Sequence, residues 1–235
     1  MSTRWLPSTF LGRLHPDTRG KILQTGTAVK YPMQRTLLRQ GDDGKHVLLL
    51  TDGVVKVVTS SESGYEMLAA VRIAGELVGE MAAFEDLPRS GSVIACGDVQ
   101  VRVIQRGDLE GFLTQHPDAM RELYRMLSAR LRWANQRRLD FQAYDAPTRL
   151  ARVLVELSQA YGLPVAGEPD GRMVLALALT QSELASLAGL KLATAERALA
   201  NLSQLGLVER NYRKIVISDT PKLLDFARIV GRNPY

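Results

Sequence analysis

Residues 79–90 carry charged and hydroxyl side chains whose types and spacing suit a small anionic ligand. The segment reads Gly-Glu-Met-Ala-Ala-Phe-Glu-Asp-Leu-Pro-Arg-Ser, so the carboxylate of Glu80 precedes the guanidinium of Arg89 and the hydroxyl of Ser90. A carboxylate accepts a hydrogen bond from a ribose hydroxyl, and a guanidinium forms paired bonds with a phosphate. The hydroxyl and nearby backbone N–H groups would bind the remaining phosphate oxygens. These groups together predict a site for a cyclic nucleotide.

The same segment resembles the phosphate-binding cassette of the Crp/Fnr family, which usually reads Gly-Glu-Leu, a spacer, and then Arg-Ser or Arg-Thr. Met81 replaces the usual leucine, a mild change, and Gly91 replaces the usual small Ala or Ser. The alternative is an ordinary surface loop with solvated charges. The nucleotide-binding residues that the resemblance implies are Val78, Gly79, Glu80, Met81, Arg89, Ser90, Ala134 and Asn135.

The composition is that of a globular protein with two modest domains. The chain has 235 residues, of which 46% are hydrophobic and 23% charged. It has no apolar run long enough to span a bilayer and no apolar core of a signal peptide near its start, so we expect a cytoplasmic protein without membrane contact. The single Cys96 excludes a disulfide framework within one chain.

No arrangement typical of an enzyme is present in the sequence. The three histidines are far apart and lack metal-ligand spacing, and no Ser-His-Asp set, P-loop or pair of carboxylates is found. We therefore predict no catalytic residue, no metal and no cofactor other than the effector. Residues 1–120 have a net charge of −1 and residues 121–235 a net charge of +6, which favours contact between a polyanion and the C-terminal half.

Residues 28–105 contain short apolar runs separated by glycines at intervals of about eight to twelve residues, a pattern typical of a small β-barrel or sandwich. The segments 40–44 and 50–57 resemble the jelly-roll core of cyclic-nucleotide-binding domains. The residues before about Gly26 are expected to be helical and to pack on it.

A long helix is predicted from Pro117 to about Ala143 because apolar side chains recur at alternating steps of four and three. The members of this heptad seam are Met120, Tyr124, Leu127, Leu131, Ala134, Arg138 and Phe141. A seam of this length favours a parallel homodimer, although a helix lying on its own domain would bury the same stripe. The charge of Arg138 within the seam predicts that this position is either hydrated or paired with a group of the partner helix, and is not part of a dry core.

The C-terminal half has the pattern of a winged helix-turn-helix. Pro147 marks the start of a new helix that continues to Tyr161, and a strand-like run covers 173–179. Thr180 and Glu183 have the spacing of a capping box, and Gly189 permits a tight turn before a second helix from about 193 to 205. Residues 207–217 then form a hairpin with a basic tip.

This half also resembles the Crp/Fnr family, so the resemblance covers nearly the whole chain. The family's recognition helix commonly begins Ser-Arg-Glu-Thr-Val, whereas residues 191–195 read Lys-Leu-Ala-Thr-Ala. Leu192 and Ala193 cannot form the paired bonds that Arg and Glu form with guanine and cytosine, so the operator should differ. The predicted DNA-binding residues are Thr180, Gln181, Lys191, Thr194, Glu196, Arg197, Arg210, Arg213 and Lys214.

Family members that bind cyclic AMP usually carry a threonine and then Ser or Asn on the long helix, and Ala134 and Asn135 stand at those positions. Asn135 retains an amide for a purine edge, whereas Ala134 lacks the hydroxyl. Three alternatives stay open: cyclic AMP with altered affinity, another cyclic nucleotide, or a preorganised dimer that needs no ligand.

The sequence thus predicts an α+β protein with a β-roll domain (1–116), a dimerisation helix (117–144) and a winged helix-turn-helix domain (145–235). The resemblance implies a bacterial transcription regulator that binds double-stranded DNA as a homodimer, responds to a cyclic nucleotide and contacts RNA polymerase. The alternative from another class is a cyclic-nucleotide-responsive adaptor that binds a protein partner through the Leu192-Ala193 helix start.

Overall fold

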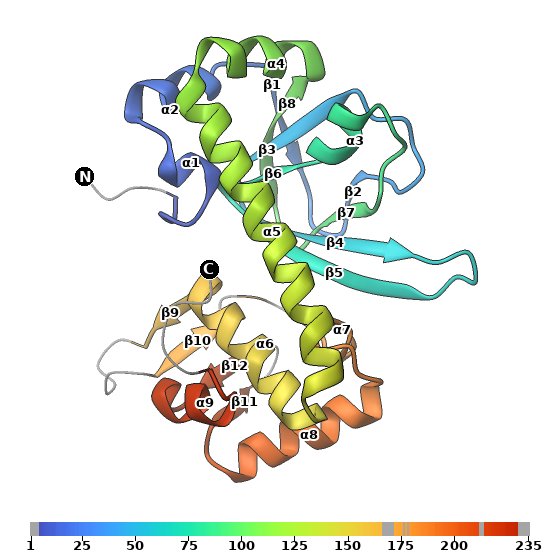
Figure 1. The fold of residues 1–235 in the computed structure, drawn as a ribbon, viewed down its shortest axis with the longest axis vertical. Helices are drawn as coiled ribbons and strands as arrows, with labels where there is room; N and C mark the ends of the chain where they lie inside the picture. The colour runs from blue at the N-terminus through green and yellow to red at the C-terminus, as the bar shows by residue number, and fades with distance from the viewer. Residues whose placement is uncertain (1–4, 166–171, 176, 178, 212–213, 230–235) are drawn as a thin grey trace. The chain divides into compact units, whose positions relative to one another are not determined.

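The computed structural model describes residues 5–165, 172–175, 177, 179–211 and 214–229 (Figure 1). The chain forms two compact units, residues 1–130 and residues 131–235, and helix α5 (Pro117–Ala143) contributes to both. The boundary between the units falls inside α5, whereas the sequence placed its domain boundaries at the two ends of this helix.

The first unit is built from two four-stranded antiparallel sheets and the helices that cover one of them. One sheet has the order β1-β8-β3-β6, with β1 (Thr27–Tyr31), β8 (Val99–Gln105), β3 (His46–Asp52) and β6 (Leu77–Val78). The other has the order β2-β7-β4-β5, with β2 (Thr36–Leu38), β7 (Ser92–Ala95), β4 (Val54–Ser60) and β5 (Glu66–Ile73). This arrangement confirms the predicted β-roll.

The centre of strand β3, residues 47–50, is apolar because both faces of the strand are buried there. Leu48 and Leu50 point into a core shared with residues of the second sheet, including Leu38 and Val93. Val47 and Leu49, on the opposite face, pack against helices. These helices are α1 (Phe10–Arg13), α2 (Pro16–Ile22), α4 (Arg106–Gln115) and the start of α5, and a short helix α3 (Glu80–Glu85) follows β6.

In its described residues, the second unit contains the end of α5, four further helices and a sheet of order β11-β12-β10-β9. Its elements are α6 (Ala146–Tyr161), β9 (Gly162–Pro164), β10 (Met173–Leu175), α7 (Gln181–Leu187), α8 (Leu192–Gln204), β11 (Val208–Asn211), β12 (Lys214–Ile217) and α9 (Thr220–Phe226). Helix α6 packs on α8 and α9. The strand predicted over 173–179 is thus found as the shorter β10; residues 176 and 178 lie outside the described residues.

The last turns of α5 are held to α6 by buried ion pairs. Asp140 is fully buried and accepts from Arg152 Nε at 2.9 Å. Arg137 pairs with Glu156, whose carboxylate also accepts from Trp133 Nε1 at 2.9 Å. These pairs join α5 and α6 across the Tyr144–Asp145 connection, so the final turns of α5 form part of the second unit's core.

Candidate functional site: a buried arginine–carboxylate cassette and a recognition helix

The predicted cassette lies where strand β6 passes into helix α3. Val78 is buried at the end of β6, and Gly79 turns the chain with a left-handed φ of 84°. A side chain at Gly79 would not fit, because a Cβ there would lie 2.6 Å from Arg89 Nη1. Glu80 then begins α3 and is buried, whereas Met81 and Ser90 are exposed.

Arg89 is buried, with only 4% of its surface exposed, and it is held by the backbone of its own domain. Its Nη1 donates to Gly79 O at 2.6 Å and its Nη2 donates to His46 O at 2.7 Å. Burial lowers the pKa of Arg89, while the charges of Glu80 and Asp42 act in the opposite direction. No carboxylate of the described chain lies within ion-pair distance of Arg89, so its charge is compensated only by neutral carbonyl groups and distant acids.

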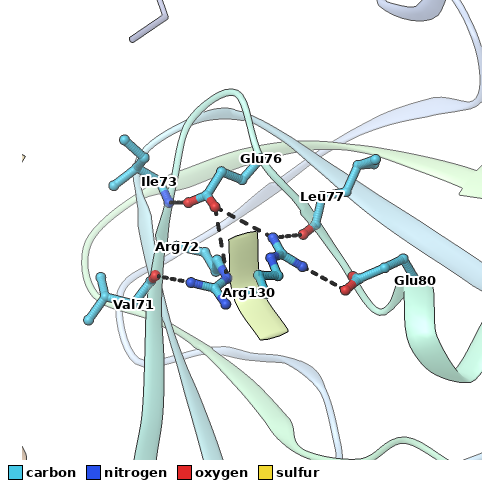
Figure 2. A network of polar contacts seen from close by, with 7 residues as sticks. All are labelled: Val71, Arg72, Ile73, Glu76, Leu77, Glu80 and Arg130. Atoms are coloured by element: carbon cyan, nitrogen blue, oxygen red, sulfur yellow. Dashed lines mark hydrogen bonds and ion pairs between the residues drawn. The ribbon is translucent and has the colours of Figure 1, made fainter. Parts of the chain in front are cut away.

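Glu80 is paired with Arg130 of helix α5 (Figure 2). Arg130 Nη1 lies 2.6 Å from Glu80 Oε1, and its Nη2 donates to Leu77 O at 2.7 Å and lies 3.5 Å from Glu76 Oε1. Burial alone would lower the pKa of Arg130, but the charges of Glu80 and Glu76 more than offset this and raise it. The carboxylate predicted to bind the ribose is therefore physically joined to the long helix.

A hollow of about 360 Å³ lies beside Arg89, and its walls are mainly polar. The segment from Gln34 to Arg39, together with Asp42, Asp43 and His46, lines it with Arg89. This volume is within the range of small-ligand sites. Glu80 is not part of this wall, so the hollow adjoins the arginine of the cassette rather than its carboxylate.

Sequence reasoning missed the contributions of Arg130 and of segment 34–46. Arg130 precedes Ala134 by four residues, which places both on one face of the helix. The presence of Arg130 on the helix face predicted to hold the nucleobase could therefore have indicated that Arg130 belongs to the site. The 34–46 wall had no such signal, because it depends on how β2 and the following loop approach Arg89.

The two positions predicted to hold the base, Ala134 and Asn135, are exposed on the part of α5 that belongs to the second unit. Along the heptad seam, Tyr124 and Leu131 are each 63% exposed, and Arg138 is exposed as well. Phe141 instead approaches Gly189, where an added Cβ would lie 2.5 Å from the Phe141 ring. The last predicted member of the seam thus contacts the turn between α7 and α8.

The helix-turn-helix follows the prediction closely. Thr180 and Glu183 form the capping box of α7, with Thr180 N donating to Glu183 Oε2 at 2.8 Å. Gly189 makes the turn with a φ of 61°. Gln181 begins α7 and Lys191 is the N-cap of α8.

On α8 itself, Glu196 and Arg197 are exposed and Thr194 is half-buried. Strands β11 and β12 form the predicted wing as an antiparallel pair. Arg213 lies outside the described residues, as do the side chains of Arg210 and Lys214.

In the part of the chain that the structure describes, no helix is long and apolar enough to cross a membrane. Within the same residues, no group of three or more His, Cys, Asp or Glu side chains could hold a metal ion.

Comparison with known proteins identifies both halves of the chain. Residues 28–116 match the family model of the cyclic nucleotide-binding domain, and residues 148–226 match that of the Crp-like helix-turn-helix domain. The chain is 28% identical over 215 residues to a CRP-like cAMP-activated global transcriptional regulator of Mycobacterium tuberculosis, an alignment that covers 92% of this chain and 94% of that protein.

Solved structures have the same fold. FixK2 from Bradyrhizobium japonicum matches with a TM-score of 0.71 and 23% identity, over 86% of this chain and 97% of that one. The c-di-GMP responsive global regulator CLP of Xanthomonas campestris matches with a TM-score of 0.71 and 25% identity, over 88% of this chain and all (100%) of that one.

Proposed function

The chain belongs to the Crp/Fnr family of DNA-binding transcription regulators, and we propose that it acts as a homodimer controlled by a cyclic nucleotide bound at Arg89 and Glu80. This family consists of regulators and not of enzymes. In the proposed mechanism, the ligand changes the arrangement of the paired α5 helices around residues 134–138. That change reorients the two recognition helices to fit successive major grooves of the operator.

The burial of Arg89 is the observation that carries the ligand proposal. A buried guanidinium that faces carbonyl groups and no adjacent carboxylate retains most of its attraction for an anion. An arginine has five N–H groups, and the two carbonyl bonds use two of them, so three remain for a phosphate. The two carbonyl bonds also fix the side chain in place, which reduces the entropy lost on binding.

The Glu80–Arg130 pair supports a connection between the ligand and α5. A ribose hydroxyl that donates to Glu80 would share this carboxylate with Arg130, so the ligand would affect a residue of the long helix directly. The carboxylates of the buried Glu80 and the half-buried Glu76 raise the pKa of Arg130 and so favour its charged form in this position. The pair therefore gives the ligand a physical means of acting on α5.

A homodimer is supported by the exposed apolar side chains of α5. Tyr124 and Leu131 lie one heptad apart on one stripe and are both largely exposed in the single chain. A second copy of α5 would cover them. A cytoplasmic location and a contact with RNA polymerase belong to the same proposal, by analogy with the family.

Calorimetry tests the effector directly. The relative from M. tuberculosis is activated by cAMP and the one from X. campestris responds to c-di-GMP, so both ligands, and cyclic GMP, should be titrated into the full-length protein. Saturable binding of one of them supports the proposal. Absence of heat with all three, together with operator binding by the free protein, would favour a ligand-independent regulator.

An adaptor that acts through a protein partner is the second candidate, because Leu192 gives the second helix of the motif an apolar, exposed start. Chromatin immunoprecipitation with sequencing separates the two. Sharp palindromic peaks are expected for the regulator, and a lack of enrichment would favour the adaptor.

A further inference from the structure

The first turn of helix α8 presents apolar side chains to solvent. Leu192 is 45% exposed and Ala193 is also exposed, whereas the inner face of the helix, Ala195, Ala198, Leu199 and Leu202, is buried. Leu192 is therefore not needed to complete the core of the second unit. In a helix-turn-helix, the start of the second helix faces the DNA. An exposed leucine at this position is therefore placed to contact a base.

The chemistry of the major groove limits what such a side chain can recognise. Base edges in this groove offer hydrogen-bond donors, acceptors and one apolar group, the C5 methyl of thymine. Neither Leu192 nor Ala193 has a polar side-chain atom. The thymine methyl is thus the one base feature that they recognise favourably, and a donor or acceptor facing them would lose its water without a replacement.

The charged side chain of Arg197 does not cover the apolar surface formed by Leu192 and Ala193. Arg197 lies one turn after Ala193, and its Nε donates to Ala193 O at 3.2 Å, so the guanidinium is directed along the helix. Its remaining N–H groups are available for a guanine or a phosphate. Leu192 and Ala193 therefore form an apolar surface at the start of the helix, and the charged side chain of Arg197 follows one turn later.

We propose that Leu192, with Ala193 beside it, recognises a thymine methyl group in each half-site of the operator. This inference rests on the proposed DNA-binding function. Relatives with Arg and Glu at these two positions contact guanine and cytosine, and we infer that in this chain a thymine methyl group takes the place of those contacts. An operator half-site accordingly has an A·T pair, with its thymine methyl toward the protein, opposite the first turn of α8.

The test removes the methyl group alone. Full-length protein with cyclic AMP, and in parallel without ligand, is used to select its preferred duplexes from a random pool. Each thymine of the selected half-site is then replaced by deoxyuridine, and affinity is measured by fluorescence anisotropy. Loss of one buried methyl should weaken binding about fourfold, and loss from both half-sites about fifteenfold.

The variant Leu192→Ala should bind the thymine and deoxyuridine duplexes with nearly equal affinity. Leu205→Ala is the matched control, because Leu205 is 54% exposed at the other end of α8, and it should retain the full difference. Selective operator binding without a methyl effect, or a methyl effect that survives in Leu192→Ala, overturns this inference and leaves the regulator intact. Failure of every selection would instead overturn the proposed function, and the inference with it.

Discussion

Arg130 on helix α5 and Glu80 at the start of α3 form an ion pair across fifty residues of sequence, with Nη1 and Oε1 separated by 2.6 Å. Both side chains are largely buried. The pair fixes the helix against the cassette inside the first unit. Any molecule that contacts the Glu80 carboxylate therefore also changes the surroundings of Arg130.

The first prediction concerns this pair. Glu80→Gln keeps the shape of the side chain but removes its charge, and we expect the free energy of unfolding to fall by about 1.5–3 kcal/mol. Arg130→Met should have a similar effect, and the double variant should lose less than the sum, because each change removes the same interaction. Urea unfolding of the four proteins measures this.

The control for this cycle is Glu85→Gln, which alters an exposed carboxylate at the other end of α3 and should leave stability within about 0.5 kcal/mol of the parent. Additive losses in the double variant would contradict a direct coupling between Glu80 and Arg130.

The second prediction concerns Arg89. We expect Arg89→Leu to weaken cyclic-nucleotide binding at least about thirtyfold, because removal of one partner of a desolvated charge pair costs about 2–5 kcal/mol. It should also lower the thermal midpoint, since the carbonyls of Gly79 and His46 lose their donors. Calorimetry and thermal unfolding measure the two effects separately.

Arg89→Lys separates these effects further, because it keeps the charge and loses the paired N–H geometry. It should recover part of the affinity. Unchanged affinity in the folded Arg89→Leu protein would refute the assignment of residues 79–90 as the phosphate site.

The third prediction restores a hydroxyl at the predicted base position. Ala134→Thr should strengthen cyclic AMP binding by up to about tenfold, the value of one hydrogen bond to the base. Ala129→Thr is the matched control, because it makes the same substitution on another face of α5 and should not change the affinity. If the two variants bind alike, Ala134 does not face the base.

The fourth prediction follows from Lys191, the N-cap of α8. Lysine forms no side-chain capping bond there and places a cation at the positive end of the helix dipole. Lys191→Ser should therefore stabilise the free protein by about 1 kcal/mol. It should also weaken DNA binding and reduce the salt dependence, because one phosphate contact per half-site is lost.

Chemical unfolding and DNA titrations at several salt concentrations measure the two effects of Lys191→Ser. A stabilised protein with unchanged salt dependence would show that Lys191 does not contact phosphate.

Local patterns predicted much of the fold. The heptad repeat gave both ends of α5 (Pro117–Ala143), and the spacing of Thr180 and Glu183 predicted the capping box of α7. These features depend on residues within one or two helical turns. The cassette was also recognisable, because Gly79, Glu80 and Arg89 lie within eleven residues.

The features that the sequence did not predict all depend on distant contacts. The partner of Glu80 is fifty residues away, and Arg89 is held by the carbonyl of His46, which has no side-chain signal. Phe141 fitted the heptad spacing, but the missing Cβ of Gly189 lets its ring contact the helix-turn-helix. Periodicity cannot distinguish an apolar side chain that packs against a partner helix from one that packs within its own unit.

The ion pairs between α5 and α6 have a consequence for the stiffness of the second unit. To bend the chain at Tyr144–Asp145, the protein must separate Arg137 from Glu156 and Asp140 from Arg152, and stranding one buried charge costs about 3–5 kcal/mol. Allosteric coupling free energies are typically about 1–3 kcal/mol. If the last turns of α5 rotate, moving α6 with them therefore costs less free energy than breaking the ion pairs between the two helices. Because α6 packs on α8, the recognition helix would then move with α5 and α6 as one rigid body.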